Sequence, residues 1–446
     1  MKIAVFNGSP KGDNSVTLQT VLWIKKNFPE DSFEFLNVAQ LLRQYENNME
    51  PAIAAANSAD LLLFSYPVYT FLAPYQLHRF IELLKASGCK IAGKFAAQVS
   101  TSKHFFDVTA QNFIEENCGD MGLLYLGGLS ADMDDLLSQK GREEAIGFWR
   151  YVHFCASENI CSPPAAKAHR AAPPIYTQCL PEAPKSKAFE VVVVTDCHAD
   201  DENLLAMISD FCRTFPYNVH IVNIRDFPFK GGCLGCFRCA ANGKCVYTDG
   251  FDVFLREQIQ SCDAIVYAFC VRDHSMGSSF KLYDDRQFCN GHRTVMMGRP
   301  TGYLISGNYS DEQNLRMVLE GRSEVGQNFL AGIATDEADT SAAIERLILS
   351  LSYALETKLS LPQNYLGVGG TKIFRDLIYV MRGLMREDHR FYKKNKIYDF
   401  PQKKVGTILK MKFVGSLMSF EFVRKKMGSK MNDEIIKPYK KAISEN

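Results

Sequence analysis

Short runs of apolar residues recur along the first third of the chain. They lie at 3–6, 33–36, 61–65, 95–99 and 123–125. Between them, stretches such as 74–86 and 108–117 carry apolar residues at the three- and four-residue spacing of a helix. Buried strands that alternate with helices are joined by right-handed crossovers, which make the strands parallel. The pattern therefore predicts an α/β domain built on a doubly wound parallel sheet.

The same pattern returns after a break. Residues 162–187 are rich in Pro and Ala and lack apolar periodicity, which is typical of an extended linker. Beyond them, an apolar run at 191–194 leads into a helical stretch at 204–211. Further apolar runs follow at 220–224, 264–269, 302–306 and 329–333. Asp60 and Asp263 precede apolar runs at matching places in the two halves. We therefore expect an internal duplication of one α/β unit.

The pattern changes again near residue 361. Helical stretches rich in Lys, Arg and Met follow at 374–385 and 420–427, and 391–401 has the composition of an irregular connection. The sequence thus predicts two tandem doubly wound sheets with a linker between them and a basic helical extension at the C-terminus. In chain order, the predicted bounds of these four segments are 1–161, 162–187, 188–360 and 361–446.

Composition limits the class of protein. Of the 446 residues, 46% are hydrophobic and 23% are charged, which is typical of a globular chain. No apolar run approaches the roughly 20 residues of a transmembrane helix, and the first residues lack the core of a signal peptide. We therefore expect a cytoplasmic protein with reduced thiols.

Charge is divided unevenly along the chain. Residues 371–446 carry 19 Lys and Arg against 8 Asp and Glu, a net +11, so the other 370 residues carry −10. A basic tail suits an acidic partner, a phosphate-bearing ligand or a membrane surface, and it also suits the chain's own acidic body. The tail contains no recognisable nucleic-acid motif, so no specific nucleic-acid partner is expected.

The segment NGSPKGDNSVT, residues 7–17, connects the first predicted strand to the first helix. Ligands of open parallel sheets bind beyond the carboxyl ends of the strands, where a helix N-terminus attracts anions. Hydroxyl groups of this segment could add hydrogen bonds to a terminal phosphate, although neither a dinucleotide fingerprint nor a Walker motif is present. The alternative is an ordinary capped turn.

Two further segments follow strands at the same predicted edge. One is Pro67, Val68, Tyr69 and Thr70, and the other contains Thr101 and Ser102. The first offers a rigid backbone and an aromatic ring, and the second offers polar donors. Together with the loop at 7–17, they suit a ligand with an anionic tail and a flat ring. The alternative for Tyr69 is packing in the core.

These motifs, in this order, resemble the flavodoxin-like, NAD(P)H-dependent FMN reductase family. The resemblance covers residues 1 to about 150. It implies a flavodoxin-like fold, FMN as cofactor and NAD(P)H as co-substrate. It places the phosphate of FMN near Ser9, Lys11, Asn14, Ser15 and Thr17, the isoalloxazine ring near Pro67, Val68, Tyr69 and Thr70, and the polar edge of the ring near Thr101 and Ser102.

Four of the 14 cysteines are crowded into one segment of the second half: Cys233, Cys236, Cys239 and Cys245. Such compact spacing favours a [4Fe–4S] cluster, whose corner irons each take one thiolate. Structural zinc usually uses two pairs of cysteines held well apart. Zinc, a redox-active thiol pair and unmodified thiols remain the alternatives.

The segment around these cysteines resembles the cluster loop of iron–sulfur flavoproteins, over residues 188–310. The resemblance includes 275–281 and Asp285 and Arg286, which match the ring-side loop and helix of those proteins. In that family a flavin and a cluster face each other across a subunit contact, which a duplicated chain would contain internally. The turn at 195–203 departs from the family because three acids would face a phosphate there. We therefore expect FMN in the first domain and the cluster in the second.

The sequence thus predicts an oxidoreductase that passes electrons between NAD(P)H or ferredoxin, FMN, the cluster and a small-molecule or protein partner. No residue is assigned as a catalytic acid or base. Two alternatives remain: an FMN-dependent quinone or flavin reductase without a cluster, and a non-enzymatic electron carrier. A homodimer of the duplicated chain is compatible with either, since duplication can replace a dimer or occur within one.

Overall fold

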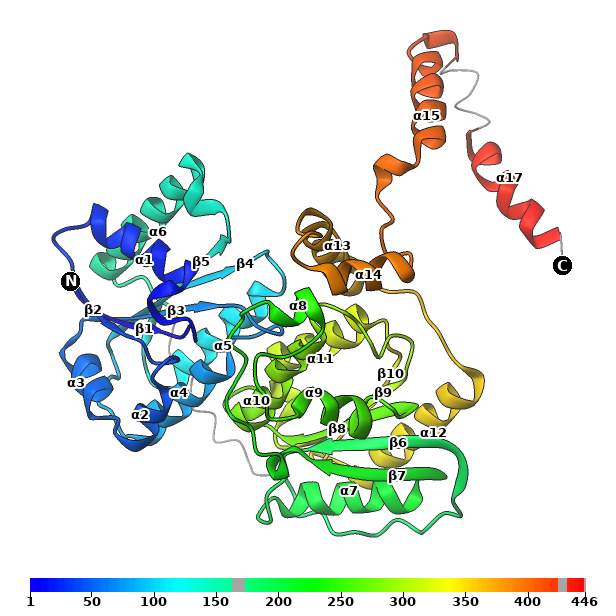
Figure 1. The fold of residues 1–446 in the computed structure, drawn as a ribbon, viewed down its shortest axis with the longest axis horizontal. Coiled ribbons are helices and arrows are strands. Elements are labelled where there is room, and N and C mark those ends of the chain that lie inside the picture. The colour runs from blue at the N-terminus through cyan, green and yellow to red at the C-terminus, as the bar shows by residue number, and fades with distance from the viewer. Residues whose placement is uncertain (163–172, 424–430, 445–446) are drawn as a thin grey trace. The chain divides into compact units, whose positions relative to one another are not determined.

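The computed structural model describes residues 1–162, 173–423 and 431–444 (Figure 1). It divides into two compact units, Met1–Arg390 and Phe391–Asn446. The first unit contains both sheets, and the first part of the predicted helical extension belongs to it as well. Of the predicted linker, 162–187, residues 163–172 lie outside the described residues. Residues 173–185 contain neither helix nor strand, and a strand begins at Ser186.

The first domain contains a parallel five-stranded sheet in the order β2-β1-β3-β4-β5. This is the flavodoxin-like strand order, whose ligand site lies between the first and third strands. The strands are β1 (Lys2–Asn7), β2 (Ser32–Leu36), β3 (Leu61–Pro67), β4 (Phe95–Ser102) and β5 (Leu124–Asp132). All pairings are parallel, as the alternating pattern predicts.

Helices cover both faces of this sheet. Those on one face are α1 (Val16–Asn27) and α6 (Gln139–Glu158). Those on the other face are α2 (Leu42–Asn47), α3 (Glu50–Ser58), α4 (Tyr75–Ala86) and α5 (Asp107–Asp120). Because the strands are buried on both faces, they form near-continuous apolar runs.

The second domain repeats this architecture. Its sheet has the order β10-β9-β8-β6-β7, which is the same flavodoxin-like order when the strands are counted along the chain. The strands are β6 (Ser186–Thr195), β7 (Tyr217–Asn223), β8 (Ala264–Cys270), β9 (Thr301–Ser306) and β10 (Leu330–Thr335). The main helices are α7 (Glu202–Thr214) and α12 (Thr340–Thr357) on one face, and α10 (Gly277–Arg286) and α11 (Gln313–Gly326) on the other.

Two aspartates make equivalent hydrogen bonds in the two domains. Asp60 Oδ2 accepts a hydrogen bond from the Lys2 backbone N–H (2.7 Å), at the start of β1. Asp263 Oδ2 accepts one from the Glu190 backbone N–H (2.9 Å), at the corresponding point of β6. Each aspartate ties the first strand of its sheet to the third. The two domains are thus copies of one α/β unit, which confirms the predicted tandem fold.

The two domains pack through equivalent helices. α4 lies against α10, and α5 lies against α11. The apolar core is continuous across the junction, because Phe64 and Phe80 of the first domain and Phe269 and Phe280 of the second belong to one buried cluster. Packing of this kind fixes the relative positions of the loops at the junction.

His274 lies between two carboxylates of different domains at the edge of this junction. Its Nε2 lies 3.0 Å from Asp120 Oδ2 of the first domain, and its Nδ1 lies 2.9 Å from Glu312 Oε2 of the second. Burial lowers the pKa of His274, but the hydrogen bonds to Asp120 and Glu312 and their charges outweigh burial and raise the pKa to about 10. The protonated imidazole therefore stabilises the folded state.

A His274→Gln variant is expected to be less stable than the wild type by about 1–3 kcal/mol at pH 6. The raised pKa makes this contribution fully present below pH 6.5, the ordinary value, and lost as the pH rises to about 10. Urea unfolding of both proteins between pH 6 and pH 10 measures it. The difference in free energy of unfolding should shrink as the pH rises, and a constant difference would contradict the assignment.

The C-terminal region is helical, and two of the predicted bounds within it need correction. Its helices are α13 (Tyr365–Val380), α14 (Arg386–Lys394), α15 (Val405–Met418) and α17 (Met431–Ser444). The irregular connection predicted from residue 391 was wrong for its first residues, because α14 continues to Lys394. Glu387 and Asp388 in the first turn and Lys393 and Lys394 in the last complement the helix dipole.

The predicted helix at 374–385 is also interrupted, because α13 ends at Val380. The predicted helix at 420–427 lies partly outside the described residues. Among the helices of the described ranges, none combines the length and the apolar character that crossing a bilayer requires.

Candidate functional site

The first turn of domain 1 is a well-braced loop between β1 and α1. The Asn7 side chain donates hydrogen bonds to the Gly12 carbonyl oxygen (3.0 Å) and to Asn37 Oδ1 (2.8 Å). Ser15 is the N-cap of α1, and its hydroxyl oxygen accepts from Leu18 N (3.4 Å). The loop thus leads directly to the positive N-terminal end of a 12-residue helix.

Several buried hydroxyl groups near this edge have no hydrogen-bond partner within the described part of the chain, and two of them belong to residues predicted to surround a ligand. These two are Thr17 Oγ1, in the first turn of α1, and Thr101 Oγ1, near the end of β4. Thr101 lies beside the loop after β3, where its carbonyl oxygen accepts from Val68 N (3.1 Å). An unpartnered buried hydroxyl costs about 1–3 kcal/mol. A ligand that supplied acceptors at both positions would remove that cost.

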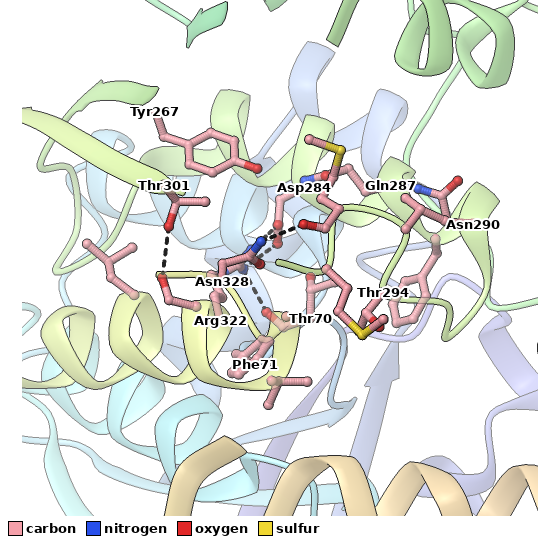
Figure 2. A pocket seen from close by; sticks show the side chains of 18 of the residues that line it. Thr70, Phe71, Tyr267, Asp284, Gln287, Asn290, Thr294, Thr301, Arg322 and Asn328 are labelled. Carbon is pink, nitrogen blue, oxygen red and sulfur yellow. Dashed lines mark hydrogen bonds and ion pairs between the residues drawn. The ribbon is translucent and has the colours of Figure 1, made fainter. Parts of the chain in front are cut away.

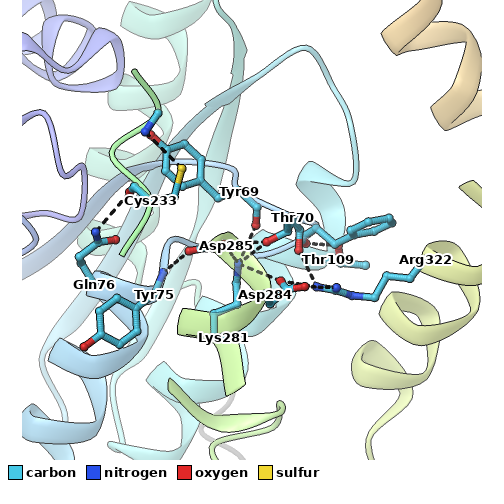
Figure 3. A network of polar contacts seen from close by, with 12 residues as sticks. Tyr69, Thr70, Tyr75, Gln76, Thr109, Cys233, Lys281, Asp284, Asp285 and Arg322 are labelled. Carbon is cyan, nitrogen blue, oxygen red and sulfur yellow. Dashed lines mark hydrogen bonds and ion pairs between the residues drawn. The ribbon is translucent and has the colours of Figure 1, made fainter. Parts of the chain in front are cut away.

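The loop that follows β3 is strained, and the second domain holds it. Thr70 and Phe71 have φ angles of +39° and +73°, in a region that residues with side chains rarely adopt. Lys281 of α10 donates to the Tyr69 carbonyl oxygen (2.9 Å) and to Thr70 Oγ1 (2.6 Å), as Figure 3 shows. Arg322 of α11 donates to the Thr70 carbonyl oxygen (3.0 Å).

Two buried carboxylates neutralise these cations. Asp285 pairs with Lys281 and accepts from Thr70 Oγ1 (2.6 Å), and Asp284 Oδ2 lies 2.6 Å from Arg322 Nη2. Burial raises the pKa of Asp284, but the charges of Arg322 and Lys281 outweigh burial, so the pKa lies below its ordinary value. Burial also raises the pKa of Asp285, and Lys281 offsets only part of this increase. The charges of Lys281, Arg322, Asp284 and Asp285 therefore nearly cancel. Their hydrogen bonds hold the loop after β3 in place at the junction of the two domains.

The four-cysteine loop of domain 2, residues 230–249, lies against the same loop of domain 1. Gly235 has a φ of +60°, and a Cβ atom added there would overlap the Tyr69 hydroxyl group. Gln76, at the start of α4, donates from Nε2 to the Cys233 carbonyl oxygen (3.3 Å). Only glycine combines that backbone conformation with so close an approach. The cysteines are thereby brought next to the loop that follows β3.

A buried arginine braces the cysteine loop from within domain 2. Arg286 donates to the Gly231 carbonyl oxygen (2.8 Å) and forms an ion pair with Asp249 (2.8 Å). Its guanidinium lies over the Tyr247 ring, 4.5 Å from the ring centroid. The Tyr247 hydroxyl donates in turn to the Gly232 carbonyl oxygen (3.0 Å). These contacts fix both ends of the segment that carries the cysteines.

These loops of the two domains enclose one cavity. Its lining includes ten of the eleven residues that the sequence predicts around FMN, namely Ser9, Lys11, Ser15, Thr17, Pro67, Val68, Tyr69, Thr70, Thr101 and Ser102. It also includes the four crowded cysteines, Cys233, Cys236, Cys239 and Cys245. The remaining residue, Asn14, is exposed at the end of a short 3-10 helix and does not line the cavity. Contact of any of these residues with FMN stays a prediction.

The four thiols share the cavity wall without forming a metal centre. Among the described residues, no group of three or more His, Cys, Asp or Glu side chains is arranged to hold a metal ion. All four cysteines are free of disulfides. Burial raises the pKa of the Cys233 thiol, and it raises the pKa of Cys239 to about 11. In this conformation both groups are neutral thiols at pH 7.

The carboxyl edge of the domain 2 sheet carries different side chains from the carboxyl edge of the domain 1 sheet. Asp201, just before α7, forms an ion pair with Arg272 (2.8 Å). Burial raises the pKa of Asp196 in the same turn to about 6. Carboxylates thus stand where domain 1 presents hydroxyl groups. This arrangement disfavours a phosphate.

Several residues of the site have roles that the sequence does not reveal. Lys281, Asp285 and Arg286, which the resemblance matches to the ring-side loop and helix of iron–sulfur flavoproteins, also have a supporting role in the structure. Lys281 and Asp285 contact the loop after β3 of domain 1, and Arg286 contacts the cysteine loop. A lysine followed three and four residues later by two acids is a weak signal of such a buried network. His292 and Phe374 also line the cavity, and no local motif marks them.

The fold and the site together define a tandem flavodoxin-like protein with a ligand cavity at the carboxyl edge of its first sheet. Residues 1–112 match the family model described as NADPH-dependent FMN reductase. No curated protein matches the chain.

Solved structures with a similar fold share little sequence with the chain. An FMN-dependent NADH-azoreductase from Bacillus anthracis, solved with FMN, is 12% identical and has a TM-score of 0.26, with 36% of this chain and 99% of that chain covered. An NAD(P)H:quinone oxidoreductase from Methanothermobacter marburgensis is 13% identical, with a TM-score of 0.28 and coverage of 38% and 99%. A flavodoxin, WrbA-like protein from Agrobacterium tumefaciens is 17% identical, with a TM-score of 0.27 and coverage of 35% and 97%.

Proposed function

We propose that this chain is an NAD(P)H-dependent FMN oxidoreductase whose FMN lies in the cavity between residues 7–17 of domain 1, which we call the phosphate loop, and the cysteine loop of domain 2. The observation that carries the proposal is that hydroxyl groups, a strained aromatic loop and four thiols converge on one cavity from distant parts of the sequence. The family match over residues 1–112 supports the choice of cofactor.

The residues present fit FMN at both ends. At one end, the N-terminus of α1 and the unpartnered Thr17 hydroxyl offer donors to a phosphate. At the other end, the unpartnered Thr101 hydroxyl and the fixed backbone of Tyr69 and Thr70 would meet the ring. Bound FMN accepts a hydride and can release electrons singly. The role of the protein is to orient the ring and to exclude water from its face.

We further propose that Cys233, Cys236, Cys239 and Cys245 hold a [4Fe–4S] cluster. Their compact spacing and their shared position on the wall of the flavin cavity support this proposal. Gathering the thiolates requires a local change in the loop, since the described conformation holds no metal-binding group. Such a cluster carries one electron at a time. The cysteine loop would then connect the flavin to one-electron partners.

Anaerobic reduction tests the flavin part of the proposal. The purified protein should show flavin absorbance that bleaches when NADH or NADPH is added without oxygen. Flavin that binds but resists both reductants would instead support a non-enzymatic carrier. Protein that binds no FMN would contradict the proposal.

A Cys236→Ser variant is expected to lose at least half of the protein-bound iron and sulfide, because one corner of the cluster loses its thiolate. Iron, sulfide and absorbance near 400 nm, measured after anaerobic purification, check this result. Cys179→Ser, at an exposed cysteine outside the cavity lining, is the matched control. Wild-type protein that contains FMN but no iron would favour a flavin or quinone reductase without a cluster.

A further inference from the structure

A second cavity of about 230 Å³ lies against the face of the domain 2 sheet that α10 and α11 cover (Figure 2). Most of its lining belongs to domain 2, and Thr70, Phe71 and Phe105 of domain 1 also line it. It exists because α10 ends at Arg286, after which residues 287–300 run mainly as an irregular loop that leaves part of β8 and β9 uncovered. In domain 1 the equivalent position is filled. Phe64, four residues after Asp60, is fully buried, whereas Tyr267, four residues after Asp263, is partly exposed to the cavity.

The walls of this cavity are mainly apolar and aromatic. They include Tyr267, Phe269, Phe280, Met276 and Met296. Aromatic faces and methionine sulfur atoms both pack well against flat rings. The cavity is larger than the roughly 150 Å³ apolar cavity that accommodates benzene. One or two fused rings would therefore suit it in size.

The charges that border the cavity largely cancel. Arg322 lines it, but Asp284, which also lines it, lies 2.6 Å from Arg322 Nη2. Arg293 lines it as well, and its Nη1 lies 3.8 Å from Asp388 Oδ1. A charged ligand would leave its solvation shell without gaining an unpaired opposite charge, which is costly. The cavity therefore favours an uncharged ligand.

Two donors in the lining lack partners. Thr294 Oγ1 and Arg322 Nε are buried, and neither has a hydrogen-bond partner among the residues that the structure describes. A guanidinium N–H can only donate, and a hydroxyl group can donate as well. The group that would satisfy either position is therefore an acceptor without a charge, such as a carbonyl oxygen. Figure 2 shows both side chains at the cavity.

We propose that this cavity of domain 2 is a binding site for an uncharged, flat aromatic carbonyl compound of one or two rings. The aromatic and methionine side chains pack on the ring, and Thr294 or Arg322 donates to the carbonyl oxygen. The proposal does not depend on FMN. The two cavities nevertheless have six lining residues in common, so a ligand of one borders the other; these residues are Thr70, Phe105, Phe288, Gly291, His292 and Phe374.

Coumarin and naphthalene are suitable probes, because both are uncharged two-ring compounds and only coumarin carries a carbonyl group. Calorimetric titration of the full-length protein, as purified, should detect binding of both. A Thr294→Val variant, which keeps the shape of the side chain and removes its hydroxyl group, should bind coumarin about fivefold more weakly and bind naphthalene as the wild type does. Equal coumarin affinity in the two proteins would overturn the role of Thr294.

A Ser323→Met variant places a larger side chain in the cavity lining and should abolish binding of both probes. FMN content and thermal unfolding report whether either variant is folded. Ser323 and Thr294 line only this second cavity, so unchanged binding in both variants would place the probes elsewhere and overturn the proposal. Wild-type protein that binds neither probe would also overturn it. None of these outcomes affects the proposed flavin site.

Discussion

Replacement of Thr17 by Val is expected to weaken FMN binding by about 10- to 100-fold. The Thr17 hydroxyl group is buried beside the phosphate loop and has no partner in the described structure, so a bound phosphate would be its acceptor. A hydrogen bond to a charged group contributes about 1.5–3 kcal/mol, which corresponds to this change in affinity. Titration of flavin-free protein with FMN, followed by the quenching of flavin fluorescence, measures the dissociation constant.

Thr20→Val provides the matched control for this experiment. Thr20 is buried in the same helix, one turn further on, and does not line the cavity. Its replacement should change FMN affinity by less than about twofold, because it removes the same group away from the phosphate. If both variants bind FMN as tightly as the wild type, the phosphate does not lie at the N-terminus of α1.

Replacement of Lys281 by Met is expected to destabilise the protein by about 3–5 kcal/mol. Removing one partner of a buried ion pair leaves an uncompensated charge, and effects of this size are typical. Lys281 is fully buried and pairs with Asp285, which also accepts from Tyr75 N (2.7 Å). Urea unfolding, monitored by circular dichroism, measures the loss in free energy of unfolding.

A second substitution distinguishes two causes of the lost stability, the unpaired charge of Asp285 and the loss of packing by the Lys281 side chain. Asp285→Asn in the Lys281→Met background removes the stranded carboxylate and keeps a hydrogen-bonding side chain. The double variant should recover about half of the lost stability, because the two residues act as a pair. If the double variant is instead less stable than Lys281→Met alone, so that the losses in free energy of unfolding add, Lys281 does not act through Asp285.

The sequence predicted the fold through signals that are local. Apolar runs of three to six residues predicted the strands, and each run lies within a strand of the structure or overlaps one. Asp60 and Asp263 marked the duplication because each ties the first strand of its sheet to the third. The position of the loop at 7–17 beside the loops after β3 and β4 was equally predictable, since a parallel sheet brings the loops after its strands to one edge.

Features that depend on contacts between distant segments were not predictable in the same way. Lys281 and Asp285 stand in a helix of domain 2, yet they hold a strained loop of domain 1 more than 200 residues earlier. The second cavity arises from the irregular path of the chain after Arg286, which no periodicity encodes. Asn14 belongs to the same motif, but it is exposed and does not line the cavity, which the motif alone does not reveal.

The proposal that FMN binds to the first domain and not to the second has a chemical basis. It rests on hydroxyl groups at the carboxyl edge of the first sheet and on the Asp201–Arg272 ion pair with the buried Asp196 at the edge of the second. The number of FMN molecules per chain, determined by titration of flavin-free protein under anaerobic conditions, tests this claim most directly. We predict one FMN per chain in the wild type. Two FMN per chain, or none, would contradict the account.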